Sequence, residues 1–171
     1  PGIGTYILQE LDLPPTVWVH DLAGTGCSGA VPNIQVGSRL IGGEENGTAL
    51  CISVEICSAT FEMGNDLSLV ISNAIFGDGA AAAVLSHRAQ GPRVVDVRNS
   101  FDTRYRDDVR YIHRGGRLHN RITSRLPGVI GELVPAFIER MCTAHGLDRK
   151  EIDRWALHPG GEKIINRLGE K

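Results

Sequence analysis

The sequence lacks several features that would assign it to a class at once. No segment approaches the ~20 consecutive apolar residues of a membrane-spanning helix. There are only four cysteines and no CxxC pair, which argues against a disulfide framework and a zinc ribbon. The net charge of −2 is too small for strong attraction to nucleic acid. No basic-then-apolar leader is present, so we expect a cytoplasmic protein without a membrane or nucleic-acid partner.

The composition is that of a folded protein. Hydrophobic residues make up 42 % of the 171 residues and charged residues 22 %, which supports a buried core and excludes global disorder. The charge is uneven, because residues 1–80 hold one basic and nine acidic residues and the rest holds 17 and 11. We interpret the first part as largely buried or as one acidic face. The chain begins at Pro1 without a Met, so we expect part of a longer protein.

Apolar periodicity predicts strands alternating with helices, which is typical of an α/β fold. Helices are expected over 30–41, 67–76 and 125–145, the last capped by Ser124, with a short turn at 148–153 and a final helix after 158–161. Strands are expected over 16–22, 49–56, 80–85, 94–97 and 154–157. The arginine-rich segment 101–121 is expected to be a loop or an irregular hairpin.

Cys27 is the first candidate for chemistry. It lies in a glycine-rich turn between a predicted strand and a predicted helix. The unpaired N–H groups and the dipole of a helix N-terminus favour an anion, and the thiolate is the nucleophilic form of cysteine. The alternative is a small buried cysteine in a tight turn. Cys51, Cys57 and Cys142 have apolar neighbours and are expected to be structural, and their spacing does not suit a metal site.

His158 is the second candidate. It follows a predicted strand and precedes a Pro-Gly-Gly turn, and the carboxyl edge of such a strand faces the ligand crevice of α/β proteins. A neutral imidazole there can accept the Cys27 proton or donate to a thioester carbonyl. The alternative is an ordinary surface histidine.

Two other patterns compete with a Cys–His site. Gly24, Gly26 and Gly29 match the GxGxxG dinucleotide fingerprint, with Glu55 where a ribose ligand would lie. The eight arginines of residues 98–125 are suited to grip a phosphorylated ligand or to form a solvated face.

Four segments in order resemble the type III polyketide synthases, the chalcone-synthase-like members of the thiolase superfamily. They are GTGCSGAVPN, ALCISVEICSATF, NAIFGDGAAAAVL and WALHPGG. The resemblance runs over essentially the whole chain, and SVEICSATF is closer to bacterial members than to plant ones. It implies a thiolase-like layered α/β/α/β/α fold, of which this chain is a central portion. Residues 1–90 would end the N-terminal half, and residues 91–171 would begin the C-terminal half.

The resemblance implies an acyltransferase that condenses an acyl-CoA starter with malonyl-CoA by decarboxylative Claisen condensation. Cys27 matches the nucleophile that carries the acyl thioester, and His158 matches the catalytic histidine. Phe76 matches an aromatic gatekeeper, and Thr60 matches a position that lines the starter pocket. The turn of Gly160 and Gly161 would contribute to substrate binding. The resemblance implies no cofactor or metal, because CoA thioesters are the substrates, and it implies a homodimer.

Three departures from the family pattern are visible. The catalytic asparagine of the family lies beyond Lys171, and the N-terminal portion with basic residues for the CoA phosphate is absent. The family has a second gatekeeper phenylalanine, and its position falls near Asn120 in this chain, which suggests a cavity of different shape or polarity. The surrounding GRLHNRITSRLP also resembles synthases that make dihydroxyphenylacetyl-CoA from malonyl-CoA alone. We expect the isolated chain to be inactive.

Three alternatives remain at this point. A ketosynthase III-like fatty-acid enzyme would depend on a carrier-linked substrate. A dinucleotide-binding domain would bind NAD without any need for Cys27. A non-catalytic relic that pairs with a partner subunit would have an unreactive Cys27.

Overall fold

The computed structural model describes residues 2–88 and 90–170, which form two compact units. The first unit comprises the residues up to Ser53 together with Ala81–Val97. The second comprises Val54–Ala80 together with the residues from Arg98 onward. The units are therefore interleaved along the chain. The expected division into halves at residue 90 concerns the complete fold and stays a prediction.

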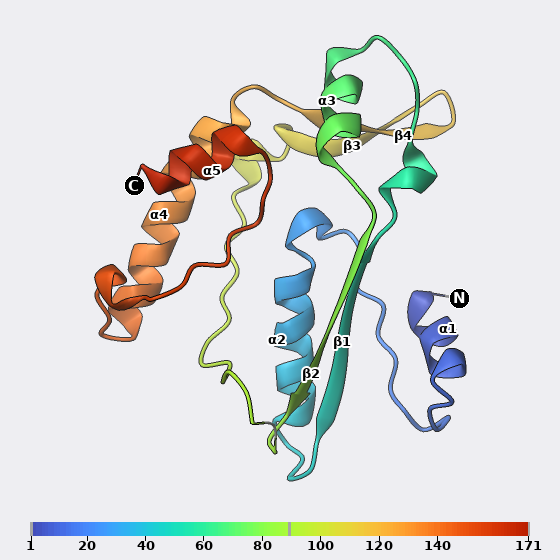
Figure 1. The fold of residues 1–171 in the computed structure, drawn as a ribbon, viewed down its shortest axis with the longest axis vertical. Helices are drawn as coiled ribbons and strands as arrows, with labels where there is room; N and C mark the ends of the chain where they lie inside the picture. Colours follow the sequence, from blue (N-terminus) through green and yellow to red (C-terminus); the bar gives the residue numbers. More distant parts are fainter. Residues whose placement is uncertain (1, 89, 171) are drawn as a thin grey trace. The chain divides into compact units, whose positions relative to one another are not determined.

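The first unit is a helix packed beside a pair of strands. Its elements are α1 (Ile3–Glu10), a 3-10 turn (Gly26–Ser28), α2 (Ala30–Ile41), β1 (Thr48–Glu55) and β2 (Gly79–Ser86), the strands each extending slightly into the second unit. β1 and β2 pair and run in opposite directions, and α2 lies along them (Figure 1). The helix packs tightly on the strands at the buried Gly37, where a Cβ would lie 2.7 Å from Cys51 Sγ and 3.2 Å from Leu85 Cδ1.

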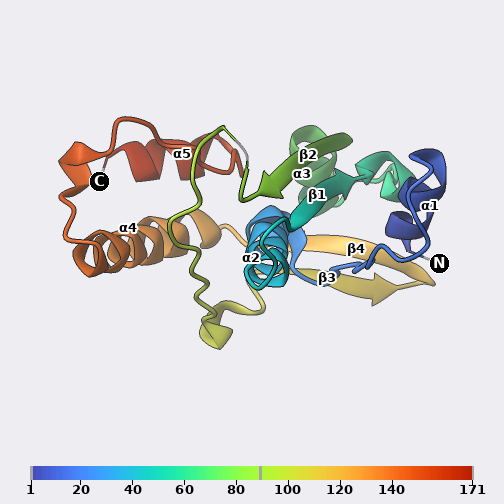
Figure 2. The ribbon, with the colours of Figure 1, turned by 90° about the horizontal axis from the view of Figure 1, so that it is seen from below.

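The second unit combines a hairpin with three helices. Its regular elements are α3 (Leu67–Ile75), β3 (Val109–Arg114), β4 (Arg117–Ile122), α4 (Leu126–Ala144) and α5 (Glu162–Gly169). Short 3-10 turns lie at Cys57–Thr60, Thr103–Tyr105 and Arg149–Glu151. β3 and β4 are antiparallel and are joined by Gly115 and Gly116, whose φ angles of +59° and +80° suit a two-residue turn. α5 lies along α4 (Figure 2).

Most of the predicted elements are confirmed. The helix over 30–41 has the predicted bounds. The bounds of the strands over 49–56 and 80–85 and of the helices over 67–76 and 125–145 differ from the prediction by at most one residue. The turn at 148–153, the final helix and the hairpin alternative for 101–121 are also confirmed. Gly146 follows α4 with a φ of +64°, as expected of a glycine that ends a helix.

Four predicted local features are wrong. Residues 16–22, 94–97 and 154–157 form no strand, because no described segment supplies hydrogen bonds to pair with them. The Val97 carbonyl instead accepts a hydrogen bond from Gln35 Nε2 at 3.0 Å. Ser124 does not cap α4, whose N-cap residue is Arg125 and has no side-chain cap hydrogen bond.

The hairpin is tied to the start of α4 by Asp108, which is 2 % exposed. Its carboxylate accepts hydrogen bonds from the Thr123 hydroxyl and from Arg125, whose Nη2 lies 2.7 Å away. The Thr123 N–H also donates to the Asp108 carbonyl at 2.9 Å. The pKa of Asp108 is held below its usual value mainly by the hydrogen bonds from Arg125 and next by the hydrogen bond from Thr123. The carboxylate is therefore stabilised in its charged form.

None of the helices in residues 2–88 and 90–170 has both the length and the apolar content to cross a membrane.

Gly37→Ala should destabilise the protein although alanine is the better helix former. The added methyl would overlap Cys51 Sγ, and overpacking costs ~1–3 kcal/mol, more than the ~1 kcal/mol gained in helix propensity. Gly128→Ala in α4 is the control, because a Cβ there meets open space and should leave stability equal or higher. Thermal unfolding of the natural protein at its full length measures both variants. Equal unfolding temperatures for Gly37→Ala and the wild type would contradict this packing.

Asp108→Asn should lower the unfolding temperature by several degrees near neutral pH, because it removes a charged acceptor from two donors. Because the pKa of Asp108 is lower in the folded than in the unfolded state, its carboxylate stabilises the fold at pH values above the unfolded pKa of ~3.9. This stabilisation is lost as the pH falls through the folded pKa. The gap between the two proteins should therefore narrow below about pH 4.

Asp107→Asn is the matched control for this variant. Asp107 is 58 % exposed and pairs with Arg106 and Arg110 on the surface, so its loss should change little. A difference in unfolding temperature between Asp108→Asn and the wild type that stays constant from pH 7 to pH 3 would refute the stabilising role of the charged Asp108 carboxylate.

Candidate active site

Cys27 lies in a one-turn 3-10 helix directly before α2 and is exposed. The turn is held by Ser28, whose hydroxyl donates to the Thr25 carbonyl at 2.7 Å, and by a hydrogen bond from the Gly29 N–H to the Gly26 carbonyl at 3.0 Å. The thiol is thus presented at the N-terminal end of a 12-residue helix, as the sequence predicted. An anion at this end is favoured by the helix dipole.

The three glycines around Cys27 each have a local structural reason. Gly24 and Gly26 have φ angles of +80° and +53°, which side chains disfavour. A Cβ at Gly29 would lie 3.1 Å from Thr25 Oγ1. The dinucleotide fingerprint also requires a strand directly before the turn, and residues 18–23 form none. The glycine pattern therefore belongs to the turn that presents Cys27.

His158 lies in an irregular segment before α5 and is exposed. The Gly160 N–H donates to the His158 carbonyl at 2.9 Å, and a Cβ at Gly160 would lie 3.2 Å from the imidazole Cδ2. Gly161 is the N-cap residue of α5, with a φ of +118°. The two glycines therefore let the chain turn tightly beside the imidazole ring.

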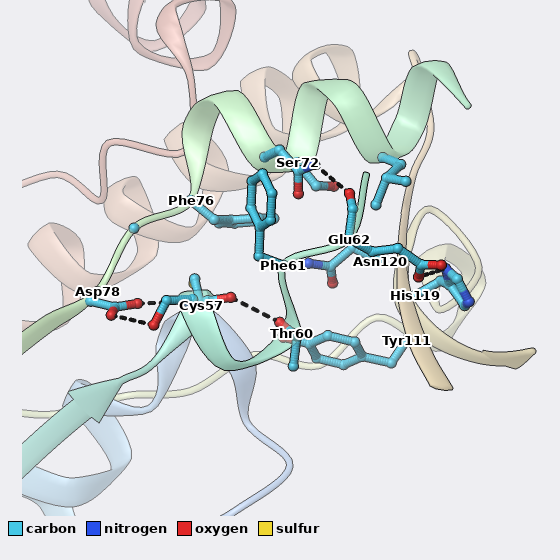
Figure 3. Close-up of a pocket in the computed structure, with 14 residues that line it drawn as sticks. Cys57, Thr60, Phe61, Glu62, Ser72, Phe76, Asp78, Tyr111, His119 and Asn120 are labelled. Atoms are coloured by element: carbon cyan, nitrogen blue, oxygen red, sulfur yellow. Dashed lines mark hydrogen bonds and ion pairs between the residues drawn. The ribbon is translucent and has the colours of Figure 1, made fainter. Parts of the chain in front are cut away.

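A cavity of about 400 Å³ lies within the second unit. Its wall comes from the turn at Cys57–Thr60, from α3 and the turn after it, and from the β3–β4 hairpin (Figure 3). The lining residues are Cys57, Ser58, Thr60, Phe61, Glu62, Leu69, Ser72, Asn73, Phe76, Gly77, Asp78, Tyr111, His119 and Asn120. Thr60 and Phe76, which the sequence singled out, share this cavity with Asn120.

Polar contacts hold two sides of this cavity. The Asp78 carboxylate accepts hydrogen bonds from the Ser58 hydroxyl at 2.6 Å and the Ser58 N–H at 2.7 Å, and these bonds lower the pKa of Asp78. On the hairpin side, His119 Nδ1 lies 3.5 Å from Glu62 Oε2. Asn73 Nδ2 donates to the Glu62 carbonyl at 2.8 Å, which joins α3 to the same segment. The turn that follows Phe76 is thus fixed to the turn that carries Thr60.

Sequence reasoning missed much of this wall. Ser72 and the Glu62–His119 pair were not singled out, because neither belongs to a recognisable motif. A serine between apolar residues on one helix was the available signal for Ser72. Cys27 belongs to the first unit and His158 to the second.

The other cysteines are packed as expected or line the cavity. Cys51 and Cys142 are each 5 % exposed, and burial raises the pKa of the Cys51 thiol. Cys57 is half-buried on the cavity wall. Across the described part of the chain, no three His, Cys, Asp or Glu side chains gather as metal ligands would.

Two solved structures share the fold of this chain closely. The model matches 1,3,6,8-tetrahydroxynaphthalene synthase from Streptomyces coelicolor with a TM-score of 0.90, at 24 % identity over 99 % of this chain and 49 % of that one. It matches PKS-I from the brown alga Ectocarpus siliculosus with the same score, at 25 % identity over 98 % of this chain and 46 % of that one. The expected thiolase-like α/β fold is confirmed by these matches.

Curated relatives give the same assignment. A 3,5-dihydroxyphenylacetyl-CoA synthase from Amycolatopsis balhimycina is 31 % identical over 98 % of this chain and 46 % of its own length. The alpha-pyrone synthesis polyketide synthase-like Pks18 from Mycobacterium tuberculosis is also 31 % identical, over 98 % of this chain and 44 % of its own length. The chain thus spans about half the length of the curated relatives it matches.

A family model accounts for the glycine-rich turn around Cys27, one of the patterns that the sequence left open. The model of the FAE1/type III polyketide synthase-like proteins matches residues 1–101, which contain Cys27, Thr60 and Phe76 together with the glycine-rich turn. No separate dinucleotide-binding motif is needed to account for that turn. The chain belongs to the FAE1/type III polyketide synthase-like family.

Proposed function

We propose that this chain is part of an acyltransferase that condenses an acyl-CoA starter with malonyl-CoA through an acyl thioester on Cys27. The family match over residues 1–101 is the observation that carries the proposal, because it includes the exposed Cys27 and most of the cavity wall, Thr60 and Phe76 among it. The complete enzyme is a cytoplasmic homodimer that needs no cofactor. Residues 1–90 end its N-terminal half, and residues 91–171 begin its C-terminal half.

Cys27 performs the covalent step. Its thiolate attacks the thioester carbonyl of the starter, a C–S bond to Cys27 forms, and CoA leaves as the thiol after taking up a proton. Malonyl-CoA then loses CO₂, and the resulting enolate carbon attacks the Cys27-bound acyl group. The new C–C bond releases the Cys27 thiolate, so the residue is ready for another cycle.

His158 stabilises the charges that form in these steps. Its imidazole accepts the proton of Cys27 before attack and donates to the thioester oxygen that becomes negative during decarboxylation. The close fit of Gly160 against the ring and the positive φ of Gly161 support this role, because they orient the imidazole and leave the approach to it uncrowded.

The cavity beside Phe76 receives the acyl chain. Its volume of about 400 Å³ is within the usual range of small-molecule sites, ~300–1,000 Å³. Thr60 lines the starter end and Phe76 separates the cavity from the CoA approach. Asn120 makes the wall more polar than a phenylalanine would, which suits a growing chain that carries ketone oxygens.

Cys27→Ala should abolish condensation, and His158→Ala should lower kcat/KM about 10²–10⁴-fold, the usual contribution of a general acid–base. The assay uses the natural protein at its full length with malonyl-CoA and an acyl-CoA, with product and the acylated enzyme followed by mass spectrometry. Cys142→Ala is the control, because that thiol is buried in α4 and should not matter. Full acylation of Cys27→Ala would sink the proposed role. Dependence on a carrier-linked substrate would favour the ketosynthase alternative.

Alkylation rates should distinguish the exposed Cys27 from the buried Cys51. At pH 7, iodoacetamide should label the exposed Cys27 at least about tenfold faster than Cys51, because the reactive thiolate is suppressed at Cys51 by burial. Raising the pH should increase Cys51 labelling more steeply, since burial raises the pKa of that thiol. Peptide mass mapping measures both rates. Equal labelling of the two thiols in the folded protein would contradict these environments.

A further inference from the structure

Ser72 is a buried polar residue on the wall of the cavity. It lies in α3, is 5 % exposed and lines the cavity together with Phe76. Figure 3 shows it on the helix close to Phe76 and Glu62. Within the described residues its hydroxyl has no hydrogen-bond partner.

This lack of a partner is unusual for a buried hydroxyl, since the large majority of buried side-chain polar atoms are hydrogen-bonded. Ser68, one turn earlier on α3, follows the usual pattern. Its hydroxyl donates to the Asn120 carbonyl at 3.5 Å and accepts from the Ile122 N–H at 3.4 Å. Ser68 therefore joins the helix to the hairpin, whereas the hydroxyl of Ser72 makes no such link.

The place of Ser72 is suited to a ligand. Rotation about its Cα–Cβ bond turns the hydroxyl between staggered positions, and no existing hydrogen bond is lost in doing so. The same cavity carries the apolar rings of Phe61 and Phe76 and the polar groups of Asn120 and of the Glu62–His119 pair. A bound chain therefore meets apolar surface with a few polar groups, the usual composition of a site that orients its ligand.

We propose that the Ser72 hydroxyl donates a hydrogen bond to a ketone oxygen of the acyl chain, which makes this cavity selective for β-ketoacyl chains over hydrocarbon chains of equal length. The proposal rests on the proposed function and adds a specificity-determining residue to it. A hydrocarbon chain would leave the hydroxyl without a partner, whereas a ketone oxygen would satisfy it. Sites built to pair with a substrate's polar group discriminate against analogues that lack the group.

The test compares two starters that differ by one ketone oxygen, acetoacetyl-CoA and butyryl-CoA. In the natural protein at its full length, Ser72→Ala should lower the ratio of kcat/KM for acetoacetyl-CoA to that for butyryl-CoA by about five- to tenfold, as expected for one neutral hydrogen bond. Val70→Ala on the same helix is the control, because Val70 is 48 % exposed and does not line the cavity, so this variant should leave the ratio unchanged.

A structural role for Ser72 would give a different result. Ser72→Ala should keep or raise the unfolding temperature, because it removes a buried hydroxyl without a partner and introduces a better helix former. A lower unfolding temperature, or an unchanged starter ratio in a wild type that uses both starters, would overturn the inference. A wild type in which Cys27 is acylated by neither starter nor by malonyl-CoA would overturn the proposed function itself.

Discussion

The cavity of the second unit depends on the hydrogen bonds of the buried Asp108 carboxylate, because they hold the hairpin that forms part of its wall. Asp108 lies just before β3, while Thr123 and Arg125 lie just after β4, so one side chain closes the open end of the hairpin and fixes it at the start of α4. Ser68 then joins α3 to β4. The hairpin residues that line the cavity are therefore held by a charged hydrogen-bond cluster at one end and a helix contact beside it.

The regular elements could be predicted wherever the sequence carries its own periodicity or its own end signals. The helix over 30–41 has apolar residues at helical spacing and glycines on both sides, and both of its bounds were predicted. The strand over 49–56 is a nearly continuous apolar run. The segments 16–22, 94–97 and 154–157 have the composition of strands, but a strand exists only where another segment pairs with it, and composition does not reveal the partner.

The candidate site likewise has residues that could be predicted from the sequence and surroundings that could not. Cys27, Thr60, Phe76 and His158 lie in short motifs, so a single sequence and a family resemblance were enough to single them out. Their surroundings depend on residues far apart in the chain, as in the Ser58–Asp78 and Glu62–His119 pairs. Ser72 is the clearest example, because its significance comes from the lack of a hydrogen-bond partner among the described residues, and a sequence does not record an absent hydrogen bond.

The interleaving of the two units has a consequence for how such a protein can change. The chain passes from the first unit to the second at residue 53, returns at residue 81 and leaves again after residue 97. An exchange of one contiguous piece cannot replace either unit alone and complete. A piece that ends at Ser53 carries most of β1 without its partner β2, and a piece that begins at Arg98 carries the β3–β4 hairpin without α3. Replacing a whole unit therefore needs two separate pieces of the chain at once, whereas a point substitution leaves the packing partners within each unit in place.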